Sequence, residues 1–346
     1  MTTGTLQTHK PTAGADKAPG MLTRVTRSTT SYVAVAVIVL IVAFTVATQG
    51  TFLSVTNLQS IGRNSAGLIL LAVGLAFVLG AGHIDLSIGA TLVLSSVVSA
   101  QTIVALAGTS STANLTGVIV IGALVGVAVG ALVGLVNGLL VTRLKINSFV
   151  VTLGTMGIAL GAAQVLTGGA NVAGLPASLQ LNFGIANLIG IPLPLVLAIV
   201  VTAVGAVVLG QTALGRHSLA VGSSETGARR AGVRVELTTI AVFIISGTMA
   251  GIAGFFDITR FGTTAISGHD TTMLQALSAV IIGGTSLFGG RASILGAAIA
   301  TFIPTVLLAG FVMVGVSSFY QGIAIGVVLI VAVWIDHLRR PRQAAR

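Results

Sequence analysis

The chain has 346 residues, of which 54% are hydrophobic, and only 24 carry a formal charge, 17 basic and 7 acidic. Soluble domains carry about 25% charged residues, whereas this chain carries 7% and has a mean hydropathy of +1.06. This composition excludes a disordered protein and, despite the net charge of +10, a basic nucleic-acid binder; the absence of cysteine excludes a disulfide scaffold, a thiolate zinc site and a cysteine nucleophile. We therefore predict an all-α, polytopic membrane protein that lies in the lipid bilayer.

The chain begins with a polar tail, residues 1–30, which has no hydrophobic period and is expected to be disordered and cytoplasmic. A helix needs about 20 apolar residues to cross the hydrocarbon, and the uncharged stretches that follow accommodate about ten transmembrane helices. We place them near residues 31–49, 62–81, 86–107, 115–141, 148–167, 192–210, 238–257, 273–288, 293–314 and 319–337. They form one predicted transmembrane domain, residues 31–338, which is followed by a basic cytoplasmic tail, residues 339–346.

The basic residues orient these helices, because lysine and arginine near helix ends stay on the cytoplasmic side. If the N-terminus is inside and the helices alternate in direction, 15 of the 17 basic residues lie inside and only Arg63 and Arg260 lie outside. The inside set is Lys10, Lys17, Arg24, Arg27, Arg143, Lys145, Arg216, Arg229, Arg230, Arg234, Arg291, Arg339, Arg340, Arg342 and Arg346. This bias predicts that both termini are cytoplasmic.

The motifs of energy-converting and hydrolytic enzymes are missing from the sequence. None of the three lysines lies in a G-x-x-x-x-G-K-[ST] sequence, so the chain does not hydrolyse ATP through a P-loop. A proton-coupled carrier for a small neutral solute would need ionisable groups in the membrane, and the candidates are Asp85, beside His83, and Asp257. That carrier stays as an alternative, as does a structural or receptor-like membrane protein; otherwise a partner protein supplies the energy.

The longest predicted cytoplasmic connection, residues 211–237, contains the sequence pattern of one short helix. Ser223 or Ser224 would be its N-cap, Glu225 lies in the first turn beside the positive helix end, and Gly232 ends it. Small residues on one face and arginines on another suit docking into a groove of a partner. A solvated loop that carries ordinary inside charges explains the composition equally well.

Five blocks of sequence resemble one family of transporters. Glu225, Ala228 and Gly232 resemble the E-x-x-A-x-x-x-G loop of permease subunits in ATP-binding-cassette (ABC) importers. The other blocks resemble the ribose, xylose and galactose branch of that family: residues 72–75 (AVGL) with 82–89 (GHIDLSIG), 149–156 (FVVTLGTM), 279–291 (AVIIGGTSLFGGR), and 320–322 (YQG) with 332–336 (AVWID). The resemblance covers roughly residues 50–340. His83 and Ala292 depart from the pattern of the family, which leaves the sugar undetermined.

The resemblance implies the permease subunit of an ATP-driven, binding-protein-dependent importer of a pentose or hexose, located in a bacterial plasma (inner) membrane. It implies that the chain is not an enzyme and binds no cofactor or metal, while a separate ATPase subunit binds ATP and magnesium. The implied partners are that ATPase, an extracytoplasmic sugar-binding protein and a second permease in a homodimer or pseudo-dimer, with no nucleic acid.

Three groups of site residues follow. The predicted ATPase-coupling residues are Gly222, Ser224, Glu225, Ala228, Arg229, Arg230 and Gly232. The predicted residues of the translocation path are Asn64, Asp85, Ser87, Gln275 and Thr285. The predicted docking residues for the binding protein are Arg63 and Arg260, since arginine binds carboxylates through two parallel hydrogen bonds. For Asp85, a tight cytoplasmic turn that caps the third helix is an equal alternative.

Overall fold

The computed structural model describes residues 29–108, 115–267, 269, 271–317, 319, 320, 322–324, 326, 327, 330 and 334. The predicted basic tail, most of the last predicted helix, and all but the end of the predicted N-terminal tail lie outside these residues.

Helices dominate the described part of the chain. Eight stretches are long and apolar enough to cross a membrane: α2 (Thr29–Ala47), α3 (Val55–Gly80), α4 (Ile88–Ala107), α5 (Leu115–Arg143), α6 (Ser148–Thr167), α8 (Leu193–Gln211), α11 (Val235–Phe261), and α13 (Ile294–Ala300) with α14 (Phe302–Met313). The shorter helices are η1 (Thr51–Leu53), α7 (Ala177–Leu179), the π-helical turn η3 (Gln180–Gly184), α9 (Ala213–Ser223), α10 (Glu225–Arg230) and α12 (Thr272–Ile282). The prediction of an all-α protein with many spans is confirmed at this level.

Between η3 and α8 the chain forms one small antiparallel hairpin. It consists of β1 (Asn187–Leu188) and β2 (Ile191–Pro192), in which Asn187 pairs with Pro192 and Leu188 pairs with Ile191. The sequence predicted only a turn in this part of the chain.

Two predicted helices differ from the structure near the C-terminal end of the described residues. The helix predicted over 273–288 is α12, which ends at Ile282 after 11 residues, because Gly283 and the left-handed Gly284 (φ +98°) begin a loop. The helix predicted over 293–314 is interrupted at Thr301. Pro304 lies one turn later and has no backbone N–H to donate to the carbonyl of Ala300.

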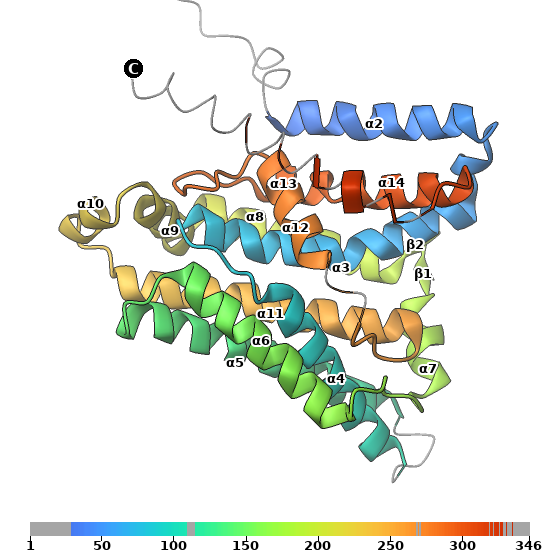
Figure 1. Cartoon of the computed structure of the whole chain (residues 1–346), viewed down its shortest axis with the longest axis horizontal. Coiled ribbons are helices and arrows are strands. Elements are labelled where there is room, and N and C mark those ends of the chain that lie inside the picture. The colour runs from blue at the N-terminus through green and yellow to red at the C-terminus, as the bar shows by residue number, and fades with distance from the viewer. Residues whose placement is uncertain are drawn as a thin grey trace, which may run out of the picture.

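Helix α3 lies at the centre of the described bundle. Within the most apolar window of each helix, 83% of residues are buried in α3 and 61% in α11, but only 11% in α2. Helix α2 runs along one edge of the molecule beside α14 (Figure 1). Its exposed apolar surface is suited to lipid, because lipid tails are as apolar as the side chains.

Helices α5 and α11 approach each other through glycine. The buried residues of α5 include glycine at every fourth position, namely Gly122, Gly126, Gly130, Gly134 and Gly138. A Cβ atom on Gly247 of α11 would lie 2.9 Å from the backbone nitrogen of Gly134, so neither backbone leaves space for a side chain. The high glycine content of the sequence therefore serves close helix packing here.

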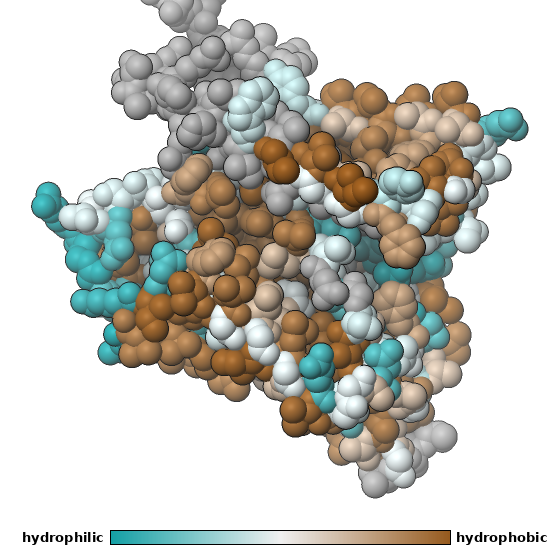
Figure 2. Space-filling view, viewed as in Figure 1, coloured by the Kyte–Doolittle hydropathy of each residue, from teal (hydrophilic) through white to brown (hydrophobic). Residues whose placement is uncertain are grey.

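The molecule has two poles, at opposite ends of the bundle (Figure 1). We call the end that carries α9, α10 and the start of α11 the α10 pole, and the end that carries α7, β1 and β2 the α7 pole. On the face drawn in Figure 2, hydrophilic surface gathers at the α10 pole and hydrophobic surface covers much of the remaining bundle.

Several described basic residues lie at opposite poles, in agreement with the charge pattern. Lys145 lies with Glu225 and Arg229 at the α10 pole. The Arg63 side chain reaches Asn187 at 3.3 Å, and the carbonyl of Arg260 accepts a hydrogen bond from the Gln180 side chain at 2.8 Å, so both arginines lie at the α7 pole. The assignment of the α10 pole to the cytoplasm stays a prediction.

Candidate functional site

The connection between α8 and α11 folds into two helices, α9 and α10. Helix α10 begins after Ser224, whose extended backbone and side-chain oxygen, which accepts from the Gly227 N–H at 3.1 Å, cap the first turn. Ala228 is buried against Val221 and Val235, which fixes the helix to its neighbours. After α10, Gly232 takes a left-handed conformation (φ +83°) and turns the chain toward α11.

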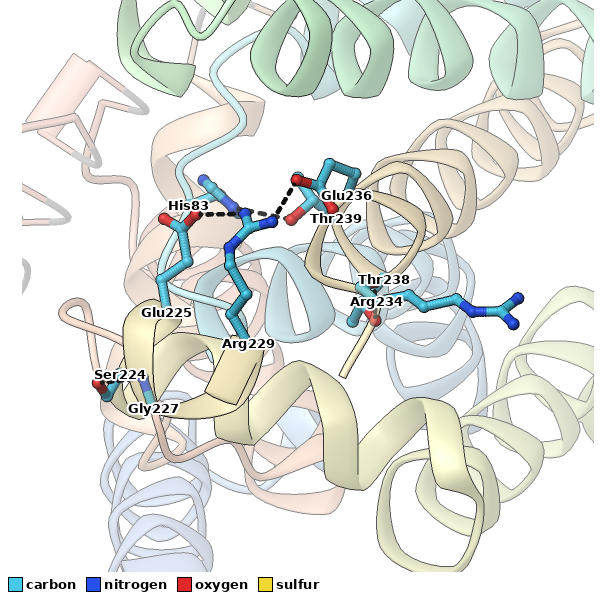
Figure 3. A network of polar contacts seen from close by, with 9 residues as sticks. All are labelled: His83, Ser224, Glu225, Gly227, Arg229, Arg234, Glu236, Thr238 and Thr239. Atoms are coloured by element: carbon cyan, nitrogen blue, oxygen red, sulfur yellow. Dashed lines mark hydrogen bonds and ion pairs between the residues drawn. The ribbon is translucent and has the colours of Figure 1, made fainter. Parts of the chain in front are cut away.

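The charged residues of α10 form a network at the surface of the α10 pole. Arg229 lies between two carboxylates, Glu236 at 2.7 Å and Glu225 at 3.2 Å, whereas Arg234 points away from them (Figure 3). The hydrogen bond to Glu236, followed by the one to Glu225, raises the pKa of Arg229. Since Arg229 and Glu225 are partners of each other within the chain, the exposed Arg230 at the end of α10 is better placed to meet another protein.

Beside this network lies a cavity of about 740 Å³ at the α10 pole. His83 lines it, and its Nε2 atom lies 3.3 Å from the hydroxyl of Thr239. Burial lowers the pKa of His83, and the nearby carboxylate of Glu225 opposes this effect in part.

A contact among three glycine-containing segments joins α9 to the bundle. We call it the glycine contact; it consists of Gly80 at the end of α3 and Gly82 just after it, Gly222 in α9, and Gly289 and Gly290 before α13. The Gly290 N–H donates to the carbonyl of Gly80 at 3.0 Å. A Cβ atom on Gly222 would lie 2.6 Å from the nitrogen of Gly290 and would also overlap the carbonyl oxygen of Gly80. Sequence reasoning placed Gly222 in the coupling loop but did not detect these contacts.

Asp85 lies in the turn between α3 and α4, where it is 3% exposed. One of its oxygens accepts from the N–H and hydroxyl of Ser87, at 3.0 and 2.6 Å, and the other accepts from the hydroxyl of Ser246 at 2.7 Å. The Ser87 hydroxyl in turn accepts from the side chain of Asn137 at 2.8 Å. Burial raises the pKa of Asp85, while these hydrogen bonds oppose the shift.

Thr285 lies in the loop between α12 and α13 and is also buried. Its hydroxyl accepts from the Ser293 N–H at 3.1 Å, so it holds this loop together. The residues predicted for the translocation path are therefore divided: Asp85, Ser87 and Thr285 hold backbone turns, whereas Asn64 and Gln275 line a cavity at the α7 pole.

That second cavity, which we call the α7 cavity, has a volume of about 310 Å³ and lies between α3, α11, α12 and α14. It brings together the predicted path residues Asn64 and Gln275 and both predicted docking residues, Arg63 and Arg260. Asp257 also lines it, and its carboxylate lies 3.1 Å from Nε2 of His269. Both side chains of this pair are largely buried, at 12% and 14% exposed respectively.

The sequence carried no signal for His269, because this residue lies in the connection between α11 and α12, away from any recognisable motif. Among the described residues there is no group of three or more histidine, aspartate or glutamate side chains that could hold a metal ion.

The sequence matches known transporter components over most of its length. Residues 57–333 match the family described as "Branched-chain amino acid transport system / permease component". Similar proteins include the ribose import permease protein RbsC of Bacillus subtilis, with 33% identity over 83% of this chain and 86% of the relative. The D-allose transport system permease protein AlsC of Escherichia coli has 33% identity over 83% of this chain and 85% of the relative. The xylose transport system permease protein XylH of Escherichia coli has 30% identity over 89% of this chain and 91% of the relative. No solved structure gives a significant match.

Proposed function

This chain belongs to the family of transport-system permease components, and we propose that it is the membrane-spanning subunit of an ATP-driven, binding-protein-dependent importer of a monosaccharide. The observation that carries the proposal is the similarity to ribose, allose and xylose permeases over more than four-fifths of the chain. The eight apolar spans suit a multi-pass protein of a bacterial inner membrane. The family and these relatives do not favour the alternative, a proton-coupled carrier that uses Asp85 and Asp257.

The energy enters through the α10 pole, which faces the cytoplasm together with both termini. Helix α10 docks in a groove of a separate ATPase, which binds ATP and magnesium; this chain contributes no cofactor site. The capped, surface-exposed form of α10 supports this role, since its N-terminal Glu225 and its last residue, Arg230, are both exposed. The residues that carry out the coupling are Gly222, Ser224, Glu225, Ala228, Arg229, Arg230 and Gly232.

The glycine contact supports a route by which movement of α10 reaches the bundle. Helix α9 precedes α10 by a single residue and is packed backbone-to-backbone against the end of α3 and the loop before α13. Because glycine allows these three segments to touch without side chains between them, a displacement of α9 must shift α3 and α13 as well. ATP binding to the partner would then favour one of two states of the bundle.

At the opposite pole an extracytoplasmic sugar-binding protein delivers the solute. Arg63 and Arg260 are its proposed docking residues, through carboxylates on the receptor. The solute path runs through the bundle, and its proposed residues are Asn64, Asp85, Ser87, Gln275 and Thr285. Two copies of this permease, or two related permeases, form the complete transport unit.

Co-purification tests the proposal at its most specific point. We expect an ATPase subunit expressed with this chain to be retained by the wild type and lost by Glu225→Lys and by deletion of residues 223–232. Gln211→Lys is the matched control. Gln211 is exposed and precedes α9, so the new lysine adds positive charge outside α10. Retention of the ATPase by both α10 variants would contradict the proposed docking site.

A further inference from the structure

We propose that the α7 cavity binds the transported sugar directly, with Arg260, the Asp257–His269 pair and Gln275 as the groups that contact its hydroxyls. This inference rests on the proposed function, because it assigns a solute site within the permease itself.

Polar side chains of this apolar chain converge on the α7 cavity. Asn64 lies on α3, Asp257 and Arg260 lie on α11, Gln275 lies on α12, and all four line the same cavity. Only 7% of the chain is charged, and ionisable residues within membrane helices are costly and mark substrate pathways. Their arrangement around one cavity, on three separate helices, indicates a ligand.

Several polar groups of the cavity have no partner among the described residues, although Asp257 pairs with His269. Among the described residues, the Arg260 side chain forms no hydrogen bond or ion pair; its guanidinium carbon lies 4.4 Å from the centre of the Phe261 ring. The side-chain oxygen of Asn64 and Nε of Arg63, in the lining of the cavity, are buried and have no hydrogen-bond partner within the part of the chain that the structure describes. Structural networks pair their buried polar groups, so these unpaired groups point to a partner that arrives from outside the chain.

The chemistry of the cavity fits a sugar better than an anion. A hydroxyl group donates one hydrogen bond and accepts others, so it suits both the guanidinium of Arg260 and the carboxylate of Asp257. An anionic group would satisfy the two arginines of the lining, Arg63 and Arg260, but it could not donate a hydrogen bond to the carboxylate of Asp257, which would repel it. Phe256 and Phe261 also line the cavity and provide apolar surface for the C–H groups of a sugar ring.

Size and position agree with this assignment. A volume of about 310 Å³ is at the lower end of the range for small-molecule sites and corresponds to about ten water molecules in the liquid, which is the scale of one monosaccharide. The cavity lies at the α7 pole, which the charge pattern assigns to the outside. A solute that enters from the binding protein would therefore reach Arg260 before it crosses the bundle.

Saturation-transfer NMR tests this site in a complex of the permease and its ATPase in lipid nanodiscs, without the binding protein. The probes are ribose, xylose and allose, with gluconate as an anionic probe of similar size. We expect saturation transfer from the protein to at least one of the sugars. The affinity for that sugar should be at least tenfold lower in Arg260→Gln and in Asp257→Asn, because each variant removes a charge-assisted hydrogen bond. Arg143→Gln, an exposed arginine at the opposite pole, should bind as the wild type does. Transfer to gluconate alone, or to no probe, would overturn the inference.

Two further measurements separate the possible failures. Retention of the ATPase during purification shows that each variant has assembled, and His269→Gln, compared with the exposed His217→Gln, provides a second, milder substitution at the site. ATP-driven uptake by the complete complex tests the proposed function independently. Uptake of a sugar with no binding to the permease would refute the α7 cavity as the solute site and leave the proposed function intact, whereas binding without uptake would refute the proposed function.

Discussion

Replacing Gly222 with alanine perturbs the glycine contact at its centre. The new Cβ atom would lie 2.6 Å from the nitrogen of Gly290 and 3.0 Å from the carbonyl carbon of Ala81, and it would overlap the oxygen of Gly80. All three are backbone atoms, so no side chain can rotate away to make space. The substitution must therefore move α9 away from the end of α3 or from the loop before α13.

The expected magnitude follows from the cost of overpacking. Forcing an extra methyl group into a closely packed site destabilises a protein by about 1–3 kcal/mol, and the rigid neighbours of Gly222 place this variant in the upper part of that range. If α9 stays in place instead, the new Cβ atom must push the Gly80 carbonyl or the Gly290 nitrogen aside and so disturb the hydrogen bond between them, which is 3.0 Å in the structure.

The assay is a denaturant titration of the purified permease in mixed micelles, combined with ATP-driven uptake by the reconstituted complex. Gly210→Ala is the matched control: Gly210 lies in α8 near the same pole, and a Cβ atom there would have no atom within 4 Å. We expect the control to be neutral or more stable by up to about 1 kcal/mol, since alanine favours helix. Equal stability and equal uptake in the two variants would refute the structural importance of the glycine contact.

Three further predictions concern other parts of the molecule. Burial lowers the pKa of His83. The folded state therefore gains stability above the unfolded-state pKa of about 6.5 and loses it as the pH falls below that value, so His83→Gln should flatten the pH profile of the unfolding free energy; an unchanged profile would argue against this effect of burial. Asp85→Ala leaves buried donors unpaired and should lower the unfolding free energy by about 1–3 kcal/mol, whereas lost uptake at unchanged stability would favour its predicted place in the path instead. Double reversal, Arg63→Glu with Arg260→Glu, should weaken receptor-dependent uptake at normal membrane abundance. Because Arg260 is also assigned to the sugar site, docking is measured separately as retention of the binding protein on the complex, and retention at the wild-type level would argue against docking at these residues.

Hydropathy predicted the approximate bounds of most of the described helices, because it acts over long segments; about ten spans were predicted, and the described residues contain eight candidate spans. The membrane requires about 20 apolar residues per span, so α4, α6 and α8 begin and end within two residues of their predicted bounds. Hydropathy alone does not distinguish a long apolar helix from a short helix followed by an apolar, glycine-containing loop. For this reason α12 was predicted to be longer than it is. Hydropathy also missed α9, since an 11-residue helix between polar connections resembles a loop in composition.

The site was predictable only where residues lie close in sequence. The cap, the charged first turn and the terminal glycine of α10 lie within nine residues, so local capping rules identified them. The α7 cavity is formed by residues far apart in the chain, such as Asn64 and Gln275, and nothing in their spacing links them. Arg63 and Arg260 were detected by their unusual charge for that side of the bundle, but the cavity between them depends on tertiary packing.

The most direct test of the proposed function is sugar uptake by proteoliposomes that contain this permease, its ATPase and its binding protein. We predict that uptake of a monosaccharide requires ATP and the binding protein, is lost in Glu225→Lys, and does not respond to a proton gradient. Uptake by the permease alone, driven by a proton gradient, would contradict the account and identify a self-sufficient carrier.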